Sequence, residues 1–367
     1  MHENPHLSVM KLAYNDLGDE GAVIIASGFV VGGEHHKNLS VLDLGFNGIG
    51  DEGCAALALQ AVAGNQTLGK LYLSGNNIRE KGALSLAGAM LHGCSLTSLH
   101  ITANHVGAIG IQALARAVAE NEAYRNAQIC RENGNQSPNH CELKTMEELY
   151  LGDTSMTANG FIPVPSMLMT NLSLRILCLS NNGLDDQSMS LLSQAIYRNK
   201  NVPLESVQLS FNEITCAGLE CFMNAIWGSQ TLRELKIDNN WIQDRGAQLA
   251  AVVLTSIDLE VLDIGFNRIT HVGIKALMKS LSETSSLQIL SISGIPLDAT
   301  ACKAVSYGLA YSSSLRAFHV DSCQAGYSGQ RHIVAGIVSN RRASLRVLTG
   351  FELGGECRSF RQVNESL

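Results

Sequence analysis

The sequence is poor in aromatic residues, in charged residues and in long apolar runs. Aromatic residues make up 5% of its 367 residues and charged residues 16%, whereas apolar residues make up 46%. This apolar content excludes an intrinsically disordered chain. No apolar run approaches the roughly 18 residues that a membrane-spanning helix needs, so we expect no membrane partner. The net charge is −7 and no basic cluster exceeds the pair Arg341–Arg342, which argues against nucleic-acid binding.

A secretion signal and a disulfide framework are also missing. The N-terminus from Met1 to Pro5 lacks the basic and apolar segments of a signal peptide. The ten cysteines are scattered, and most of them, Cys54 and Cys221 for example, occupy positions that hold Ala, Leu or Ser elsewhere in the chain. We therefore expect free thiols that behave as small apolar residues, and a cytoplasmic location.

Motifs for catalysis, cofactors and metals are absent in the same way. The chain has no G-x-x-x-x-G-K-[ST], no G-x-S-x-G, and no strand-bound G-x-G-x-x-G before a helix. Cys130, His140 and Cys141 could supply three metal ligands, but a fourth is missing and no C-x-x-C spacing occurs. We predict no catalytic residues, no enzyme activity, no cofactor and no metal site.

What the chain does contain is an internal repeat. Leu39, Leu42 and Leu44 are followed by Asn47 and Gly53, and from Leu39 onward this frame recurs at steps of 27 to 30 residues apart from one step of 50. A fixed period in this range predicts a solenoid, in which each unit buries its apolar face by stacking on its neighbours.

Each repeat has two halves with different periods. In Leu235-Lys236-Ile237 apolar and polar residues alternate, which predicts a short strand. After Gly53 apolar residues recur at three- and four-residue spacing, which predicts an amphipathic helix. Since helices are wider than strands, stacked repeats are expected to curve, with parallel strands on the concave side and helices on the convex side.

An asparagine stands between the two halves of most repeats. Its amide both donates and accepts, so stacked copies can pair with backbone groups that a turn leaves open. We expect looser turns where Thr154, Ile295 and Cys323 replace it. We predict a structural asparagine ladder formed by Asn15, Asn47, Asn76, Asn104, Asn182, Asn212, Asn240 and Asn267.

The full pattern, L-x-x-L-x-L-x-x-N-x-[LIV]-x-x-x-G followed by an Ala- and Leu-rich helix, resembles the ribonuclease-inhibitor-like class of leucine-rich repeats. Eleven copies are recognisable, and a degraded twelfth begins at Leu345. The resemblance implies a right-handed α/β horseshoe of about 11 to 12 repeats, as in the arrays of NOD-like receptors and in the Ran GTPase activator. The chain lacks the high cysteine content and the alternating repeat subtypes of ribonuclease inhibitors, so the resemblance implies the fold and not the inhibition of nucleases.

The repeats are expected to occupy residues 1–355, followed by a short tail at residues 356–367. The long step from Leu96 to Met146 predicts an inserted loop at residues 124–143, which either marks a binding face or is a tolerated disordered connection. Beyond this insertion, Pro163 and Pro165 are expected to shorten the next helix or to leave it extended.

Two positions of the repeat are expected to face a partner from the concave side. They are the residue between the two strand leucines and the residue two places after the second leucine. Exposed aromatic residues are enriched in protein interfaces. The alternative for the three phenylalanines is that they pack on the neighbouring repeat as consensus residues. We predict as partner-binding residues Phe46, Tyr72, His100, Tyr150, Asp153, Gln208, Phe211, Lys236, Asp263 and Phe266.

Lys236 is expected to pair with Asp263 or Asp238 on this surface, because neighbouring strands lie about 4.8 Å apart. The histidines do not suggest a reaction centre, since His100 and His319 lie too many repeats apart to act together.

These features favour a non-catalytic module that binds a protein partner of unknown identity. The chain starts on a repeat at Leu7 without a polar cap, which favours a fragment such as the recognition array of a NOD-like receptor. One alternative is a GTPase-activating protein of the Ran GTPase activator type. It predicts a long acidic tail, whereas residues 356–367 hold two acidic residues and two arginines. The other is a cytoskeletal scaffold of the tropomodulin-like class.

Overall fold

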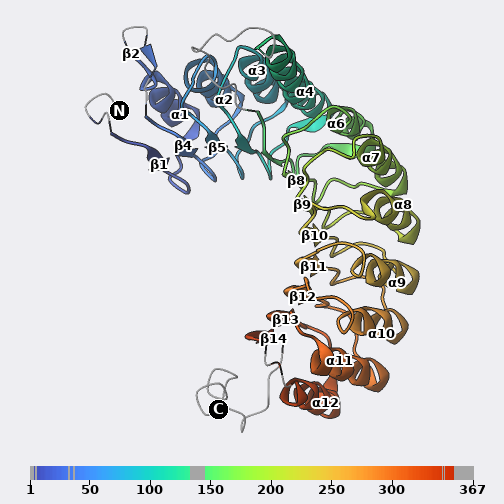
Figure 1. Ribbon diagram of the computed structural model, residues 1–367. Helices are drawn as coiled ribbons and strands as arrows, with labels where there is room; N and C mark the ends of the chain where they lie inside the picture. Colours follow the sequence, from blue (N-terminus) through green and yellow to red (C-terminus); the bar gives the residue numbers. More distant parts are fainter. Residues whose placement is uncertain are drawn as a thin grey trace. The chain divides into compact units, whose positions relative to one another are not determined.

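The computed structural model of the chain describes residues 4, 6–31, 34–35, 38–132, 145–340, 342 and 344–350. The chain divides into two compact units, Met1–Val207 and Gln208–Leu367. Within each unit short strands alternate with helices, and the helices lie on one side of the strands (Figure 1). The side of the sheet that the helices leave uncovered is the open face of that unit.

The first unit contains the parallel strands β1 (Val9–Lys11), β4 (Val41–Asp43), β5 (Lys70–Tyr72), β6 (Ser98–His100), β7 (Glu148–Tyr150) and β8 (Ile176–Cys178). Its helices are α1 (Gly18–Ser27), α2 (Asp51–Leu57), the π-helical turn η1 (Ala58–Val62), α3 (Glu80–Leu91), α4 (Gly107–Glu132), α5 (Thr157–Phe161), α6 (Pro163–Leu168) and α7 (Asp186–Arg198). A small antiparallel hairpin is formed by β2 (Val30–Val31) and β3 (Glu34–His35). Strand β9 (Ser206–Gln208) spans the division between the units.

The second unit repeats the same order of elements. Its strands are β10 (Glu234–Lys236), β11 (Val261–Asp263), β12 (Ile289–Ser291), β13 (Ala317–His319) and β14 (Val347–Thr349), which pair in parallel in that sequence. Its helices are α8 (Cys216–Ile226), α9 (Asp244–Val253), α10 (His271–Ser280), α11 (Ala299–Tyr311) and α12 (Gly326–Ser339). Strand β14 belongs to the degraded twelfth repeat.

The strands are aligned so that identical repeat positions pair. The central leucines pair in register in the order Leu42, Leu71, Leu99, Leu149 and Leu177 in the first unit, and Leu235, Leu262 and Leu290 in the second. Each of them is at most 1% exposed. Because side chains alternate between the two faces of a strand, these leucines fill the core between sheet and helices, and their neighbours face outward. The predicted α/β solenoid with parallel strands is confirmed.

The asparagines join consecutive coils at the ends of the strands. Asn76 donates through Nδ2 to the carbonyl of Leu44 in the preceding coil at 3.0 Å and to that of Leu73 in its own coil at 2.9 Å. Its Oδ1 accepts from the N–H groups of Asn47 and Ile49, both at 3.0 Å. One buried side chain thus satisfies four backbone groups of two coils.

Asn267 makes the same bonds in the second unit. Its Nδ2 donates to the carbonyls of Ile237 and Ile264 at 3.0 Å, and its Oδ1 accepts from the N–H of Ile242 at 3.0 Å. Donation through Nδ2 to backbone carbonyls is also made by Asn15, Asn47, Asn104, Asn182, Asn212 and Asn240.

Two of the substituted turn positions keep a side-chain hydrogen bond. The hydroxyl of Thr154 donates to the carbonyl of Leu151 at 2.9 Å. The thiol of Cys323 donates to the carbonyl of Ile292, in the preceding coil, at 3.3 Å. Both residues are buried. These bonds replace part of what asparagine provides, in contrast to the looser turns expected there.

Aspartates near the starts of helices add a second link between coils. Asp19 in α1 accepts through Oδ1 from the N–H groups of Gly50 and Gly53, at 2.7 and 2.9 Å, where α2 begins. Asp244 in α9 accepts in the same way from the N–H of Gly273 in α10, at 2.9 Å. The first N–H groups of a helix have no partner within it, so a carboxylate from the preceding coil is well placed to satisfy them.

The predicted inserted loop is wrong in its first half. Helix α4 continues to Glu132, so residues 124–132 are helical. The segment Ala119–Glu132 is rich in Ala, Glu and Arg and has no Gly or Pro, so its residues favour continuing the helix that precedes it. Residues 133–143 of the predicted loop lie outside the described part of the chain, as do residues 351–355 of the predicted repeat domain and the predicted tail.

The two prolines of the fifth repeat interrupt its helix. The helical segment is divided into α5 and α6 at Ile162, and Pro163 occupies the first position of α6. A proline is tolerated there because the first helical N–H has no partner within the helix. The helix is therefore shortened, which was one of the two expected outcomes, and it is not extended.

Candidate functional site

The open face of the first unit carries a stack of three rings. Tyr72, His100 and Tyr150 pair in register as the last residues of β5, β6 and β7. The ring centroids of Tyr72 and His100 are 4.2 Å apart, and those of His100 and Tyr150 are 3.9 Å apart with an angle of 15° between the planes. Strands lie about 4.8 Å apart, so three flat side chains at equivalent positions are held at stacking distance.

His100 is neutral at physiological pH in this stack. Its side chain is 18% exposed, and burial lowers the pKa of the imidazole to about 4 in spite of the nearby Glu148 carboxylate. The Nε2 atom lies 4.0 Å from Oε2 of Glu148 and has no hydrogen-bond partner among the described residues. The ring thus acts as a flat surface between two tyrosines, with one buried polar atom at its edge.

Glu148 accepts hydrogen bonds from two polar side chains beside the stack of rings. Its carboxylate accepts from Nζ of Lys70 at 3.1 Å and from Oγ of Ser98 at 2.7 Å. Burial raises the pKa of this carboxyl, but the hydrogen bonds from Ser98 and Lys70 outweigh burial, and the pKa is lowered overall. Lys70, Ser98 and Glu148 are the first residues of β5, β6 and β7, so they form a charged row parallel to the row of rings.

The sequence interpretation did not select Lys70 and Ser98 as site residues. The signal was available, because strand side chains alternate with a period of two residues. A residue two places before a predicted open-face position therefore lies on the same face.

Two of the three predicted phenylalanines, Phe46 and Phe266, pack against a neighbouring coil. Phe46 stacks on Tyr14 at a centroid distance of 4.5 Å, and on its other side it covers Gly75, where a Cβ would lie 2.3 Å from the Phe46 ring. Phe266 covers Gly294 in the same way. Both rings are still about half exposed, at 47% and 48%. Lateral packing and exposure therefore occur together at this repeat position.

The open face of the second unit is charged. Lys236 and Asp263 are register partners on β10 and β11, but the ion pair of Lys236 is with Glu234 of its own strand, at 2.6 Å. The expected ion pair of Lys236 with Asp263 or Asp238 is therefore wrong. Residues two apart on a strand share a face, and Glu234 is the acidic group that Lys236 reaches at contact distance.

Two other acidic side chains on this face, Asp263 and Asp238, accept hydrogen bonds from nearby residues. Burial raises the pKa of Asp263, whose Oδ1 accepts from the N–H of Gly265 at 3.0 Å, and the nearby Asp238 raises it further. Asp238 in turn accepts a hydrogen bond from the hydroxyl of Ser210.

The three remaining candidates are placed as follows. Asp153 is exposed and has a left-handed backbone conformation, with a φ of 51°, in the turn after β7. Gln208 is half-buried at the end of β9. Phe211 is 56% exposed in the turn after β9, also with a positive φ. The structure thus brings Tyr72, His100 and Tyr150 into direct contact. Asp153, Gln208 and Phe211 lie at separate positions.

Metal and membrane features were also sought among the described residues. No group of three or more His, Cys, Asp and Glu side chains in that part of the chain could hold a metal ion. The side chain of Cys130, together with His140 and Cys141, lies outside it. Cys54, Cys94, Cys178, Cys302 and Cys323 are buried free thiols. In the described ranges, each helix is too short or too polar to cross a lipid bilayer.

Comparison with known proteins agrees with the repeat architecture. A family model described as Leucine Rich repeat matches residues 3–26, 35–58, 64–87, 92–115, 200–223, 228–249 and 255–278. Ribonuclease inhibitor from Sus scrofa is 26% identical over 282 residues, which cover 76% of this chain and 57% of the relative. The chain therefore contains leucine-rich repeats and is similar to ribonuclease inhibitor over most of its length.

A second kind of relative contains the same repeats in a longer protein. The human protein named NACHT, LRR and PYD domains-containing protein 14 is 24% identical over 290 residues, which cover 71% of this chain. The match spans 24% of that protein and 57% of the pig ribonuclease inhibitor, so the chain corresponds to part of each relative.

A solved structure supports the fold of the leucine-rich repeats. A chain in the crystal structure of the yeast Rad7 and Elc1 complex matches with a TM-score of 0.54 at 13% sequence identity, over 86% of this chain and 70% of that one. No repeat match falls between residues 116 and 199, the region of the elongated α4 and the interrupted α5 and α6. No repeat match falls after residue 278 either, although the strands and helices there keep the same order.

Proposed function

We propose that this leucine-rich repeat chain is a non-catalytic module that binds a protein partner on its open face. The observation that carries the proposal is the stack of Tyr72, His100 and Tyr150 on three consecutive strands. Binding usually costs free energy because interface side chains lose their freedom, and these rings are already held by one another. Aromatic residues in such pre-ordered arrangements are frequent anchors of protein interfaces.

The row of polar groups beside the rings supports a polar rim for the same contact. Lys70 is paired with Glu148, and their side chains are 41% and 24% exposed. A partner therefore meets an apolar strip bordered by a fixed cation and a fixed carboxylate. Phe46 and Asp153 are further candidates for contact with the partner in the first unit.

In the second unit, the candidates are more polar or more isolated. We propose that they form a separate contact surface, in which charge complementarity contributes more to specificity than to affinity. This surface consists of Gln208, Phe211, Lys236, Asp263 and Phe266.

The relatives support a protein as the partner. The name of the pig relative states that it inhibits ribonuclease, and an enzyme is itself a protein. The name of the human relative places leucine-rich repeats beside NACHT and PYD domains. We infer that this chain serves as a recognition array of the NOD-like receptor type in the cytoplasm, and that it acts without a cofactor or metal.

Photo-crosslinking tests the open face directly. A photoreactive phenylalanine derivative introduced in place of Phe46, which is 47% exposed, is expected to crosslink one specific protein partner. Tyr72→Ala together with Tyr150→Ala should weaken capture of that partner by about 2 kcal/mol or more, or roughly thirtyfold.

Tyr197→Ala is the matched control. Tyr197 lies on α7 in the same unit and is 64% exposed, so its removal takes away the same side chain from the helical side. Loss of capture with the control variant but not with the double variant would show that the partner binds the helices, and the proposal would be wrong.

A further inference from the structure

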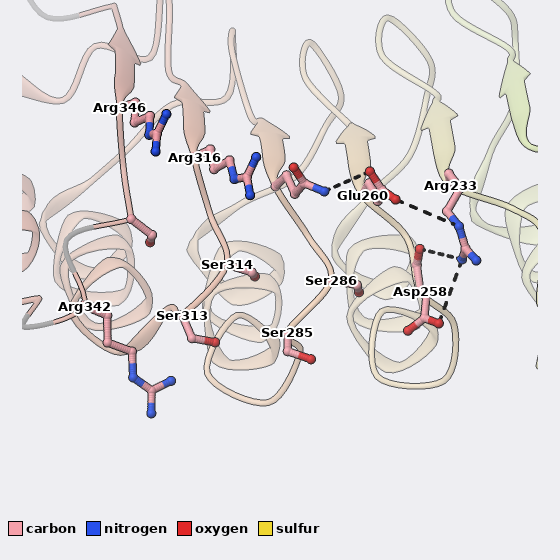
Figure 2. A pocket seen from close by; sticks show the side chains of 12 residues that line it. Arg233, Asp258, Glu260, Ser285, Ser286, Ser313, Ser314, Arg316, Arg342 and Arg346 are labelled. Carbon is pink, nitrogen blue, oxygen red and sulfur yellow. Dashed lines mark hydrogen bonds and ion pairs between the residues drawn. The ribbon is translucent and has the colours of Figure 1, made fainter.

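The second unit has a polar groove at the edge where its strands begin. The groove has a volume of about 660 Å³ and is lined by side chains that precede β10 to β14 and by the loops that lead into them. Figure 2 shows the labelled serines on the loops below Arg346, Arg316 and Glu260, with Arg342 lower still. The groove lies away from the residues proposed above for the open face.

Carboxylates outnumber arginines at one end of this groove. Arg233 donates to the carbonyl of Asp258 at 3.0 Å, and its guanidinium lies 4.0 Å from the carboxylates of Asp258 and Glu260. Gln288 donates to Glu260 at 2.8 Å. Two acidic side chains therefore share one arginine, and this end carries an excess of negative charge.

The other end holds positive charge without a partner. Arg316 and Arg346 precede the paired strands β13 and β14, and the N–H of Arg346 donates to the carbonyl of Arg316 at 2.8 Å. Both are exposed, and within the described residues neither forms an ion pair. Arg342, on the loop before β14, also lines the groove, but its guanidinium lies apart from the other two (Figure 2). Like charges on neighbouring strands repel one another, and a bound anion would relieve the repulsion.

Hydroxyl groups line the same end. Ser344 has a buried Oγ atom without a hydrogen-bond partner in the described residues. Ser313 and Ser314 lie beside it on the preceding loop. A buried hydroxyl without a partner is costly, and its O–H is a donor that suits an anionic oxygen.

We propose that this groove binds a phosphorylated segment of a protein partner, with the phosphoryl group between Arg316 and Arg346. A phosphoryl group carries a charge of about −1.5 to −2 and three acceptor oxygens, which match two guanidinium groups and a hydroxyl. A single carboxylate would be satisfied by one arginine in a bidentate pair. The phosphoryl group accounts for both arginines and for the hydroxyl.

The acidic end of the groove decides against a polynucleotide. A continuous phosphate backbone that left the arginines would meet Asp258 and Glu260, and the whole chain has a net charge of −7. A basic residue of a bound peptide is favoured at that position instead. From β11 to β14 are three strand steps, or about 14 Å, which an extended peptide covers with about four residues. The expected ligand is a peptide with a phosphorylated residue about four positions from a Lys or Arg.

The test uses the full chain and a fluorescent peptide that carries phosphoserine and a lysine at this spacing. Fluorescence anisotropy should show that the phosphorylated peptide binds at least about tenfold more tightly than its unphosphorylated form. Arg316→Gln together with Arg346→Gln should remove this difference. Arg331→Gln on α12, which also removes an arginine from the second unit but does not line the groove, should keep it.

Folding and the open face are controlled separately. Circular dichroism melting of each variant shows whether lost binding reflects lost structure, and Arg346→Lys should bind with intermediate affinity because it keeps the charge without the bidentate geometry. Tyr72→Ala should leave peptide binding unchanged, so failure of the open-face proposal does not affect this one.

Four outcomes would overturn the proposal. The first three are equal affinity for the two forms of the peptide, unchanged binding by the folded double variant, and tighter binding of a single-stranded oligonucleotide than of the phosphopeptide. Competition by inorganic phosphate alone at the affinity of the peptide would also overturn it, because the peptide would then contribute nothing.

Discussion

The open faces of the two units use the same repeat position for different chemistry. In the first unit, the last residues of consecutive strands form an aromatic stack, whereas in the second unit the equivalent register partners are Lys236, Asp263, Ser291 and His319. The buried leucines beside them are paired in the same way in both units. The backbone therefore decides which face a residue occupies, and the side chain alone decides what the face can bind.

The difference has consequences for how each face responds to its surroundings. Stacked rings keep their order at any ionic strength, because their contact does not depend on net charge. The pair of Lys236 and Glu234 is partly exposed, with side chains 39% and 27% accessible, so salt screens it. We expect changes in the shared scaffold to affect both units alike and changes in the faces to affect one unit.

The largest effect is expected at the asparagine turns, which are shared by both units. Asn76→Leu and Asn267→Leu should each lower the free energy of unfolding by about 3 to 4 kcal/mol, because several buried backbone groups lose their partner at once. Urea denaturation followed by circular dichroism measures the change. Similar losses in both units would support an equivalent scaffold, and a loss confined to one unit would contradict it.

Neighbouring and substituted positions control this experiment. Asn77→Leu, at an exposed site next to Asn76, should cost less than about 1 kcal/mol. Thr154→Ala and Cys323→Ala should also cost clearly less than the asparagine changes, since each side chain makes fewer hydrogen bonds to the backbone.

A smaller effect is expected where a phenylalanine covers a glycine. Gly75→Ala and Gly294→Ala combine a positive φ of 69° and 72° with a Cβ placed 2.3 and 2.2 Å from the covering ring. We expect a loss of about 2 to 3 kcal/mol from strain and displacement of the ring. Thermal melting of the four variants, two tests and two controls, measures it.

Gly183→Ala and Gly228→Ala are the matched controls, because their φ values are 63° and 73° with no atom within 4 Å of the added Cβ. They should lose about 1 to 2 kcal/mol from backbone strain alone. If tests and controls melt alike, the rings do not hold these coils together, and the phenylalanines are free to serve partner contact only.

An effect of intermediate size is expected in the first unit, where the free energy of unfolding should depend on pH through His100. The pKa of His100 is lowered from 6.5 to about 4 by burial, so the unfolded chain binds a proton in this window and the folded chain does not. The contribution of His100 to the free energy of unfolding is fully present above pH 6.5. It is lost as the pH falls from 6.5 towards 4, and the loss is on the order of 1 kcal/mol. Chemical denaturation of the protein and of His100→Phe across this window measures the effect.

The phenylalanine variant keeps a ring in the stack but cannot titrate. Its unfolding free energy should therefore decline less between pH 6.5 and 4 than that of the unchanged protein. Identical slopes would show that His100 is protonated at the same pH in the folded and unfolded chain.

The smallest effect is expected from the charged face of the second unit. Lys236→Met should change the free energy of unfolding by about 0.5 kcal/mol, because a partly exposed ion pair contributes little. Lys70→Met in the first unit should cost slightly more, because Glu148 is also bonded to Ser98 and would keep its charge beside the rings. Chemical denaturation at low and high salt measures the unfolding free energy of both variants. A larger loss of stability for Lys236→Met than for Lys70→Met would contradict this prediction.

Much of the fold could be predicted from the sequence because the repeat is a local signal. The spacing of leucines in Leu39, Leu42 and Leu44 predicts a strand, and the three- and four-residue spacing after Gly53 predicts a helix. The prediction was wrong at residues 124–132, where a polar composition suggested a loop although the residues favour a helix. Periodicity locates elements well, but it does not show where a helix outgrows its repeat.

The candidate site could be predicted only as a set of positions. Alternation along β5, β6 and β7 places Tyr72, His100 and Tyr150 on one face, and no local pattern says that their rings touch. The same limit applies to Lys236, for which the sequence suggested Asp263 or Asp238 as the ion-pair partner, whereas the structure pairs it with Glu234.

The sequence by itself determined the class of repeat, the alternation of faces and the asparagines at the turns, because these depend on residues that are close along the chain. Only the tertiary structure decided which side chains meet across coils. Glu148 reaches Lys70, 78 residues away, and Arg316 lies beside Arg346 without a carboxylate between them. Such contacts depend on the register between strands and on rotamers set by packing, and neither is encoded in the spacing of one repeat.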